Sequence, residues 1–266
     1  MAPPIRFIRA ELAVDEVMAA RHDEGVDFGL DGWAGVNRTP FSLGDQDPYL
    51  LPARMVTTEF VVPEVTPLEF PAFPENMTVG FWTGIDGEDG AGGNVLQAGV
   101  AARVVPWGDG LITSFKADYW AWTEWYTDEY KTPPVKVKGF PVEAGDLINI
   151  TVSAGDTVEG AVFMHNYRTG VGVSVAMTAD SGIRSTGFSC EWEVEAGSEH
   201  LPYFEPVIFS NCAGGSFVPG AEEYFTLLPG SYTSEIYRQQ GDSTTLLTET
   251  TFLSPNSAEI RRLAVD

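Results

Sequence analysis

Hydrophobic and polar side chains alternate along most of the chain, which is the pattern of strands that bury one face and expose the other. The segment VLQAGV shows this clearly. Leu96, Ala98 and Val100 share one face of the predicted strand. Gln97 and Gly99 lie on the other face, where an uncharged amide beside a residue without a side chain is unusual.

The alternation predicts strands throughout the chain after its N-terminal part. They span residues 56–62, 77–83, 96–105, 117–126, 147–154, 161–167, 171–178, 189–195 and 207–211, with weaker candidates at 232–238 and 246–252. Turn signals that contain glycine or proline, such as WGDG, KTPPV, EAGD and LPGS, separate them. Because no helical segments alternate with these strands, we expect an all-β fold of antiparallel sheets, in a sandwich or a barrel.

The N-terminal part has a different pattern. Residues 8–21 are rich in Ala, Glu, Leu, Met and Arg and contain neither Pro nor Gly, which predicts a helix. We therefore expect a short, partly helical extension or prosegment over residues 1–30, followed by a single β-sandwich domain over residues 31–266. A chain of 266 residues has an ordinary length for one all-β domain.

The charge is strongly acidic, with 38 Asp and Glu residues against 15 Lys and Arg residues and a formal net charge of −23. Such a chain repels phosphate backbones and anionic lipid surfaces, so we expect neither nucleic acid nor a membrane as a partner. The sequence has no apolar run of about 18 residues that could span a bilayer. Most carboxylates become protonated near about pH 3 to 4, so the composition is compatible with work in acid.

Common catalytic and metal-binding signatures are missing. The sequence contains no G-x-S-x-G nucleophile elbow and no H-E-x-x-H zinc motif. Its 3 histidines are isolated and its 2 cysteines do not form a metal pair, so we expect no metal and no cofactor. What remains is a set of strands with polar residues on one face.

Two of the predicted strands carry carboxylates and aromatic rings on the same face. In ADYWAWTEWY the even positions share one side, namely Asp118, Trp120, Trp122, Glu124 and Tyr126. In CEWEVE the glutamates share one face, while Trp192 and Val194 point to the core. Two indole rings on a purely solvated face would expose a large apolar area. We interpret the face as an open cleft that holds an extended ligand, with a charged outer face as the alternative for the glutamates.

Six sequence blocks follow one another along the chain. They are FWTGIDG, VLQAGV, AWTEWYTDE, HNYRTG, CEWEVE and LPYFEPVIFSNC. The series resembles the glutamic peptidases, or eqolisins, a family of acid endopeptidases that pepstatin does not inhibit. Ahead of the blocks, DGWAGV looks like the family's opening strand, so the resemblance runs from about Trp33 to the C-terminus.

The resemblance implies a concanavalin-like sandwich of two seven-stranded antiparallel sheets, with the active site on the concave face. It implies a catalytic pair of Gln97, in the L-Q-x-G block, and Glu195, the last residue of the CEWEVE block. It also implies residues that line the substrate groove or support the pair, to which we add Tyr126 from strand parity. These residues are Trp33, Trp82, Asp86 and Glu124.

Such a pair is chemically suited to acid. A glutamate can act as the base that activates water and then return the proton to the leaving amine. A primary amide can stabilise the developing oxyanion without needing a particular protonation state. Glu193 stands where the family has an aliphatic residue, and Glu191 and Glu193 share the face of Glu195. Because like charges disfavour one another's ionisation, we expect a pH optimum above the family's usual, strongly acidic range.

We therefore expect a monomeric endopeptidase that acts on polypeptides in acid, and the resemblance implies an extracellular location. Residues 1–21 lack the apolar segment that is typical of a signal peptide. The alternatives are a non-catalytic, lectin-like sandwich that binds polysaccharide or peptide, and a glycoside hydrolase with paired carboxylates. Gln97 argues against both, because neither explains an amide at that position as well as peptide hydrolysis does.

The two cysteines leave two interpretations open. If segments 189–195 and 207–212 form a hairpin, Cys190 and Cys212 lie opposite each other and a cross-strand disulfide is feasible. Otherwise the chain holds two free thiols.

Overall fold

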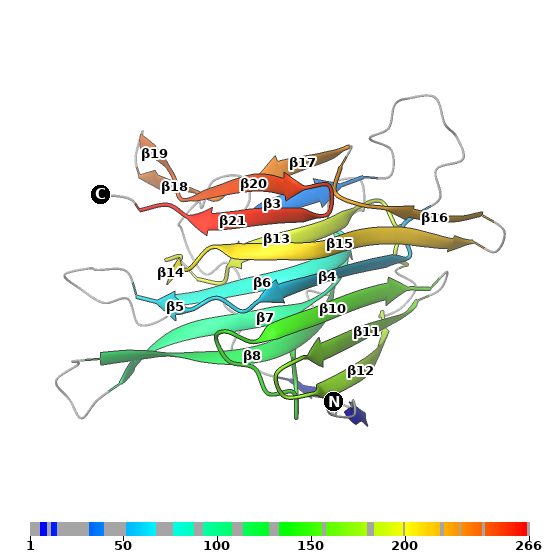
Figure 1. Cartoon of the computed structure of the whole chain (residues 1–266), viewed down its shortest axis with the longest axis horizontal. Helices are drawn as coiled ribbons and strands as arrows, with labels where there is room; N and C mark the ends of the chain where they lie inside the picture. The colour runs from blue at the N-terminus through cyan, green and yellow to red at the C-terminus, as the bar shows by residue number, and fades with distance from the viewer. Residues whose placement is uncertain are drawn as a thin grey trace.

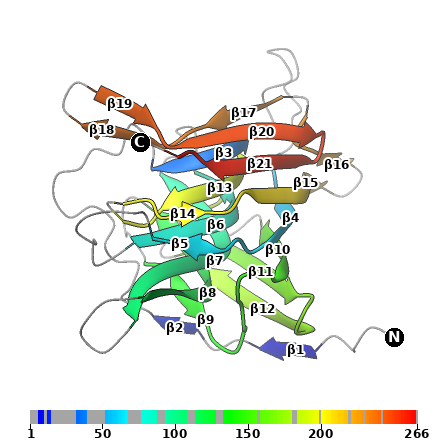
Figure 2. The same ribbon diagram turned by 60° about the vertical axis from the view of Figure 1, so that its left-hand side comes forward.

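The computed structural model describes residues 6–9, 12–14, 32–39, 52–67, 77–87, 93–107, 114–127, 133–155, 158–179, 184–198, 200–218, 221–228, 230–240 and 243–264. Within these residues every regular element is a strand, and no helix that could cross a membrane is present among them. Two large sheets pack face to face (Figures 1 and 2). This arrangement confirms the predicted all-β sandwich.

The first large sheet, which we call the site sheet, has eight strands in the order β17-β3-β13-β6-β7-β8-β9-β2. Its strands are β2 (Leu12–Val14), β3 (Trp33–Arg38), β6 (Met77–Asp86), β7 (Asn94–Trp107), β8 (Ser114–Thr127), β9 (Val135–Val137), β13 (Cys190–Ala196) and β17 (Ser231–Ser234). All neighbours in this sheet pair antiparallel, as predicted.

The second large sheet, the cover sheet, has nine strands in the order β1-β12-β11-β10-β4-β15-β21-β20, with β16 paired to β15 beside this path. Its strands are β1 (Arg6–Arg9), β4 (Met55–Val61), β10 (Leu147–Ala154), β11 (Glu159–Asn166), β12 (Val171–Thr178), β15 (Val207–Val218), β16 (Ala221–Phe225), β20 (Thr248–Ser254) and β21 (Ser257–Arg262). Two small ribbons complete the described fold, namely β5 (Val65–Thr66) with β14 (Tyr203–Phe204), and β18 (Tyr237–Gln240) with β19 (Ser243–Leu246). Both large sheets exceed the expected seven strands, in part through short edge strands such as β1, β2 and β9.

The core lies between the two sheets and consists of side chains from alternate strand positions. Half-buried and buried residues alternate along the whole of β10. The ring centroids of Phe60 on β4 and Phe81 on β6 are 6.5 Å apart across the sandwich. Trp192 of β13 also enters the core, where its indole N–H donates a 3.1 Å hydrogen bond to the backbone oxygen of Thr57 on β4. Because Trp192 faces the cover sheet, its neighbours in β13 point to the outer face of the site sheet.

The predicted N-terminal helix is wrong for the described residues. Arg6–Arg9 form β1, which pairs in parallel with β12, and Leu12–Val14 form β2, which pairs with β9. Each segment extends the edge of a large sheet, and the backbone hydrogen bonds formed there outweigh a weak local preference for helix. The other residues of the expected extension, residues 1–30, lie outside the described part of the chain.

Strand β15 is longer than predicted and joins several partners in the cover sheet. It pairs with β21 at its start, with β4 in its middle and with β16 at its end. Its register against β4 shifts between Ser210 and Ala213, which marks a β-bulge. Asn211 lies in the bulge with φ of 51°, a left-handed conformation that asparagine tolerates better than most residues.

The hairpin that would allow a disulfide does not form, because β13 belongs to the site sheet and β15 to the cover sheet. Cys190 and Cys212 are free thiols buried in the core. Burial raises the pKa of Cys190 well above its ordinary value and raises the pKa of Cys212 to about 12. Both thiols are therefore protonated in acid and at neutral pH.

Candidate active site

Four residues form a row across neighbouring strands on the outer face of the site sheet, which we call the Gln97 row. Glu124 on β8 pairs with Gln97 on β7. Gly84 on β6 pairs with Gln97 on one side and with Glu191 on the other. Adjacent strands lie about 4.8 Å apart, so the backbones of Gln97 and Glu191 are about 10 Å apart. Gly84 has no side chain, and the ring of Trp82 covers it, with Cζ3 3.2 Å from where a Cβ of residue 84 would lie.

Gln97 is held in place by a neighbouring carboxylate. Its side-chain amide nitrogen donates a 2.5 Å hydrogen bond to Oε2 of Glu124. The residue is 1% exposed, and its side-chain oxygen has no hydrogen-bond partner among the described residues. A buried polar atom without a partner is uncommon in a folded protein, so this oxygen is a candidate to bind water or a ligand.

Glu191 is held equally closely. The hydroxyl of Ser189 donates a 2.8 Å hydrogen bond to Oε1 of Glu191, and the residue is 2% exposed. Gly87 lies directly against the carboxylate, where an added Cβ would collide with both oxygens. Gly87 also has φ of 126°, a conformation that favours glycine. The turn after β6 therefore fixes the position of this carboxylate.

Asp86 anchors the segment that leads into β13. Its buried carboxylate accepts hydrogen bonds from the backbone N–H of Thr186 (2.8 Å), the hydroxyl of Thr186 (2.6 Å) and the backbone N–H of Phe188 (2.8 Å). These contacts hold the residues immediately before Glu191. The sequence leaves open whether Asp86 lines the groove or supports the pair, and its contacts are those of a support.

Glu195 does not lie on the Gln97 row. It pairs with Gly80 on β6 and with Trp33 on β3, four residues further along β13 than Glu191. At about 3.4 Å per residue, Glu195 is displaced by about 14 Å from the residue that faces Gln97. The register places Glu191, and not Glu195, in line with Gln97 across β6. Both glutamates lie on the same strand face. Only the register of β13 against β6 decides which of them is in line with Gln97, and the sequence does not give this register.

Glu193 lies between these two glutamates and is fully buried. Its Oε2 accepts a 3.5 Å hydrogen bond from the hydroxyl of Ser234 on β17. Gly35 on β3 makes room for it, since a Cβ at Gly35 would lie 2.6 Å from the same oxygen. Among the described residues no group of three His, Cys, Asp or Glu side chains is arranged to hold a metal ion.

Tryptophan rings cover the part of this face next to the Gln97 row. Trp82 on β6 and Trp122 on β8 flank Gly99 on β7, and Trp120 and Tyr126 pack in the same cluster. A Cβ at Gly99 would lie 2.6 Å from the Cβ of Trp82, so this glycine makes room for an indole rather than leaving an empty floor. The indole N–H groups of Trp82 and Trp122 are buried and have no hydrogen-bond partner among the described residues.

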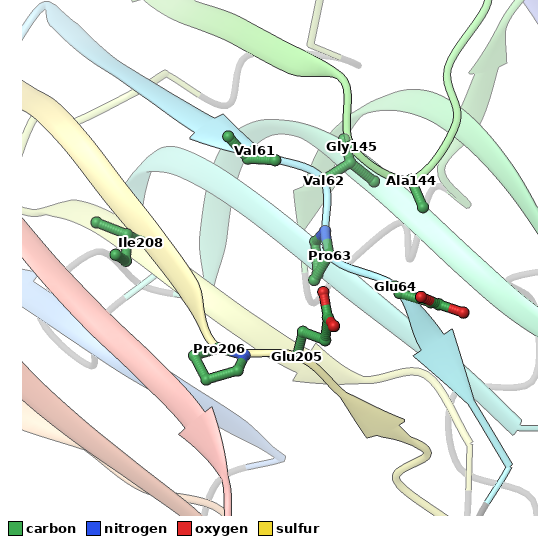
Figure 3. A pocket seen from close by; sticks show the side chains of 9 residues that line it. All are labelled: Val61, Val62, Pro63, Glu64, Ala144, Gly145, Glu205, Pro206 and Ile208. Atoms are coloured by element: carbon green, nitrogen blue, oxygen red, sulfur yellow. The ribbon is translucent and has the colours of Figure 1, made fainter.

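A pocket of about 370 Å³ lies elsewhere, around the ends of β4 and β15 (Figure 3). It is lined by Val61, Val62, Pro63, Glu64, Ala144, Gly145, Glu205, Pro206 and Ile208. The side chain of Glu205 points toward Pro63, whereas that of Glu64 points away from it (Figure 3). Carboxylates that do not converge cannot share a water or a proton, so the candidate chemistry lies at the Gln97 row.

Comparison with known proteins identifies the family of the chain. The profile of the peptidase A4 family matches residues 47–261, which is most of the chain. The chain belongs to the peptidase A4 family. It is therefore a peptide hydrolase, and the resemblance to the glutamic peptidases seen in the sequence blocks is confirmed. A search of the curated proteins found no match.

Solved structures of glutamic peptidases share the fold of this peptidase A4 chain. Scytalido-glutamic peptidase with a transition state analogue inhibitor is 20% identical, with a TM-score of 0.64 over 88% of this chain and 99% of that chain. SCP-B, an eqolisin in a complex with the tripeptide Ala-Ile-His, is 19% identical with a TM-score of 0.61 and the same coverage. Aspergilloglutamic peptidase from Aspergillus niger is 25% identical, with a TM-score of 0.52 over 70% of this chain and 99% of that chain.

Proposed function

We propose that this peptidase A4 chain is a glutamic endopeptidase that cleaves polypeptides in acid and that pepstatin does not inhibit. The observation that carries the proposal is the Gln97 row, in which an amide and a carboxylate share one face on the two strands that flank Gly84. Both side chains are almost fully buried, at 1% and 2% exposure. A water bound between them would be shielded from bulk solvent, where a preorganised amide and carboxylate act most strongly.

We assign the role of general base to Glu191. The family resemblance pointed to Glu195, the last glutamate of the same block. A base and an oxyanion donor must both reach the same reacting atoms, within about 3 Å of each. Strand spacing and rise separate the backbones of Gln97 and Glu195 by about 17 Å, but those of Gln97 and Glu191 by only about 10 Å. The register therefore supports Glu191.

The proposed reaction uses the two side chains in turn. The Glu191 carboxylate takes a proton from a water, whose oxygen attacks the carbonyl carbon of the scissile peptide bond. One N–H of the Gln97 amide is donated to Glu124, and the other donates to the oxyanion that develops on the substrate. Glu191 then gives its proton to the amine nitrogen as the C–N bond breaks. Glu124 keeps the amide oriented, and Asp86 keeps β13 in place.

We propose an extended polypeptide as the substrate. The unpaired indole N–H groups of Trp82 and Trp122 are suited to donate hydrogen bonds to its backbone carbonyl groups. Tyr126 packs against the tryptophan cluster and extends its apolar surface, and Trp33 lies opposite Glu195 on the same face. Among the structural relatives, SCP-B holds a tripeptide and scytalido-glutamic peptidase holds a peptide-based transition state analogue. We further propose that the enzyme works as an extracellular monomer, in line with the family resemblance.

Pepstatin resistance follows from the composition of the proposed pair, Gln97 and Glu191. Aspartic peptidases, which pepstatin inhibits, use two carboxylates that share one proton. The proposed pair has one carboxylate and one amide, so it lacks the second carboxylate of the site that pepstatin binds in aspartic peptidases. The family match also disfavours the lectin-like and glycoside hydrolase alternatives, and the latter would need a second carboxylate where Gln97 stands.

The test is hydrolysis of denatured casein from pH 2 to 6 with pepstatin present. The wild-type protein should release peptides, with most activity on the acidic side of this range. Gln97→Ala should remain folded, by circular dichroism, and lose activity by about 100-fold or more, as for other oxyanion donors. Full inhibition by pepstatin, or unchanged activity of Gln97→Ala, would contradict the proposal. Polysaccharide binding without any cleavage would favour the lectin-like alternative.

A further inference from the structure

The outer face of the site sheet carries two cations around a single tryptophan ring. The guanidinium carbon of Arg103 on β7 lies 5.8 Å from the centroid of the Trp120 ring. Nζ of Lys136 on β9 lies 5.4 Å from the same centroid. The chain has only 15 Lys and Arg residues against 38 Asp and Glu residues, so two cations beside one ring stand out from its acidic composition. We call Arg103, Trp120 and Lys136 the basic corner.

Strand register places the basic corner on the same face as the Gln97 row. Trp120 pairs with Ala101, which lies four residues from Gln97 along β7. This separation is about 14 Å, the length of about four residues of an extended peptide. A substrate that lies along β7, with its scissile bond at Gln97, therefore reaches the basic corner about four residues from that bond.

Arg103 has hydrogen-bonding capacity that its surroundings leave unused. Its Nε is buried and has no partner among the described residues. Asp118, opposite Arg103 on β8, forms an ion pair with Lys116 at 2.9 Å. The residue opposite Arg103 on β6 is the uncharged Thr78. On β13 the carboxylate in line with the basic corner is Glu195, three strands away from Trp120.

We propose that the basic corner binds a carboxylate of the peptide substrate, so that the enzyme prefers an acidic group about four residues from the scissile bond. The inference rests on the proposed peptidase function of the Gln97 row. The planar guanidinium of Arg103 matches a carboxylate geometrically, and Lys136 adds positive potential on an otherwise acidic molecule. The carboxylate can belong to an Asp or Glu side chain or to the C-terminus of the substrate, because the two present the same chemistry.

The preference should depend on pH through the substrate. A glutamate side chain in a peptide ionises near about pH 4.3, so at pH 3 it is mostly neutral and resembles glutamine in charge. At pH 5 it is mostly ionised and can bind the cations. The ratio of kcat/KM for a Glu peptide to that for its Gln counterpart should therefore be near one at pH 3. It should rise to about tenfold at pH 5, the effect of one charge-assisted hydrogen bond.

The experiment uses internally quenched peptides that differ only in the fourth residue on either side of one cleaved bond, which is Glu or Gln. A second pair ends at that residue with a free or an amidated C-terminus. Wild type is compared with Arg103→Gln, with the conservative Arg103→Lys, and with Lys116→Gln as a matched control. The control removes one positive charge from the same region, but from a side chain paired with Asp118. Thermal unfolding of each variant shows whether it is folded.

We expect Arg103→Gln to bring the Glu-to-Gln ratio at pH 5 close to one, Arg103→Lys to keep part of the preference, and Lys116→Gln to keep the wild-type ratio. The peptide pair that carries the effect identifies a side-chain or a C-terminal carboxylate as the group bound. Equal cleavage of all pairs by wild type at pH 5 would overturn the inference while leaving the proposed function intact. So would an unchanged ratio in folded Arg103→Gln. Failure of wild type to cleave any peptide at any pH would instead overturn the proposed function, and the inference with it.

Discussion

Replacing Gly84 with alanine adds one methyl group at the centre of the Gln97 row. The added Cβ would lie 3.0 Å from the Cβ of Gln97, 3.1 Å from the backbone oxygen of Leu96 and 3.2 Å from Cζ3 of Trp82. Optimal contacts between non-bonded carbon atoms are about 3.5 to 4.0 Å, so these neighbours must move. The methyl group also lies between Gln97 and Glu191 in the row. We predict that Gly84→Ala folds but loses most of its activity.

Two magnitudes follow from this geometry. Overpacking of this kind costs about 1–3 kcal/mol of unfolding free energy, of which about 0.5–1 kcal/mol is offset because alanine suits a strand better than glycine. In a chain of this size 1 kcal/mol shifts Tm by about 2–4 °C, so Tm should fall by no more than about 10 °C. Displacement of a catalytic group by about 1 Å costs on the order of 100-fold in rate. We therefore expect kcat/KM to fall about 100-fold.

Gly80→Ala is the matched control, because it makes the same change on the same strand face. Its Cβ would meet the rings of Trp82 and Trp122 at 3.8 and 3.9 Å, which are ordinary contacts. The assay is the initial rate on a quenched peptide at the pH optimum, with thermal unfolding measured on the same samples. We expect Gly80→Ala to stay within about twofold of wild type, since its contacts need no rearrangement.

The opposite pattern would refute this reasoning. Gly80 pairs with Glu195, whereas Gly84 pairs with Glu191. If Gly80→Ala lost activity and Gly84→Ala kept it, the catalytic carboxylate would belong to the other end of β13. If folded Gly84→Ala worked as well as wild type, the space above Gly84 would not be the place where water and substrate react.

Three further predictions concern residues around the row. Replacing Glu193 with valine removes a buried carboxyl group two residues from Glu191 on the same strand face. Because like charges disfavour one another's ionisation, the optimum of a pH–rate profile should move to lower pH by about half a unit or more; an unchanged or higher optimum would contradict this. Asp86→Asn weakens the acceptor of four hydrogen bonds, three from residues 186 and 188 and one from Asn94, and should lower the free energy of unfolding in denaturant by about 2–4 kcal/mol, with a loss of kcat; full stability would show that these contacts are dispensable. Because burial raises the pKa of Cys190 well above its ordinary value and that of Cys212 to about 12, neither thiol should react with a disulfide reagent at pH 8 until urea unfolds the chain. Fast labelling of the folded protein would count against that burial.

The sandwich was predictable because its strands bury one face each. The alternation of residues 147–154 predicts both a strand and the side chains that point into the core, and β10 has these same bounds. The N-terminal strands were not predictable, since β1 and β2 depend on edges supplied by β12 and β9, distant in sequence. The hairpin expected to join Cys190 and Cys212 failed for a related reason. Neighbouring strands in the sequence can enter different sheets, and local pattern does not say which.

The sequence predicts which sheet face carries the candidate site, but it does not predict which glutamate is in line with Gln97. Strand parity correctly placed Gln97 and the glutamates of β13 on the outer face of the site sheet. The choice between Glu191 and Glu195 depends on how β13 aligns with β6 and β7, which is set by long-range pairing. The sequence also does not predict the hydrogen bonds of Asp86 to residues about 100 positions away.

The measurement that tests the central claim most directly is the kcat of Glu191→Gln against that of Glu195→Gln, on one peptide at the pH optimum of the wild type. Each change is isosteric and removes one carboxylate from the same strand. The account predicts that folded Glu191→Gln loses at least about 1,000-fold in kcat through loss of its base, while Glu195→Gln loses less than about tenfold. Inactive Glu195→Gln beside active Glu191→Gln would contradict the account and restore the pair that the family resemblance implied.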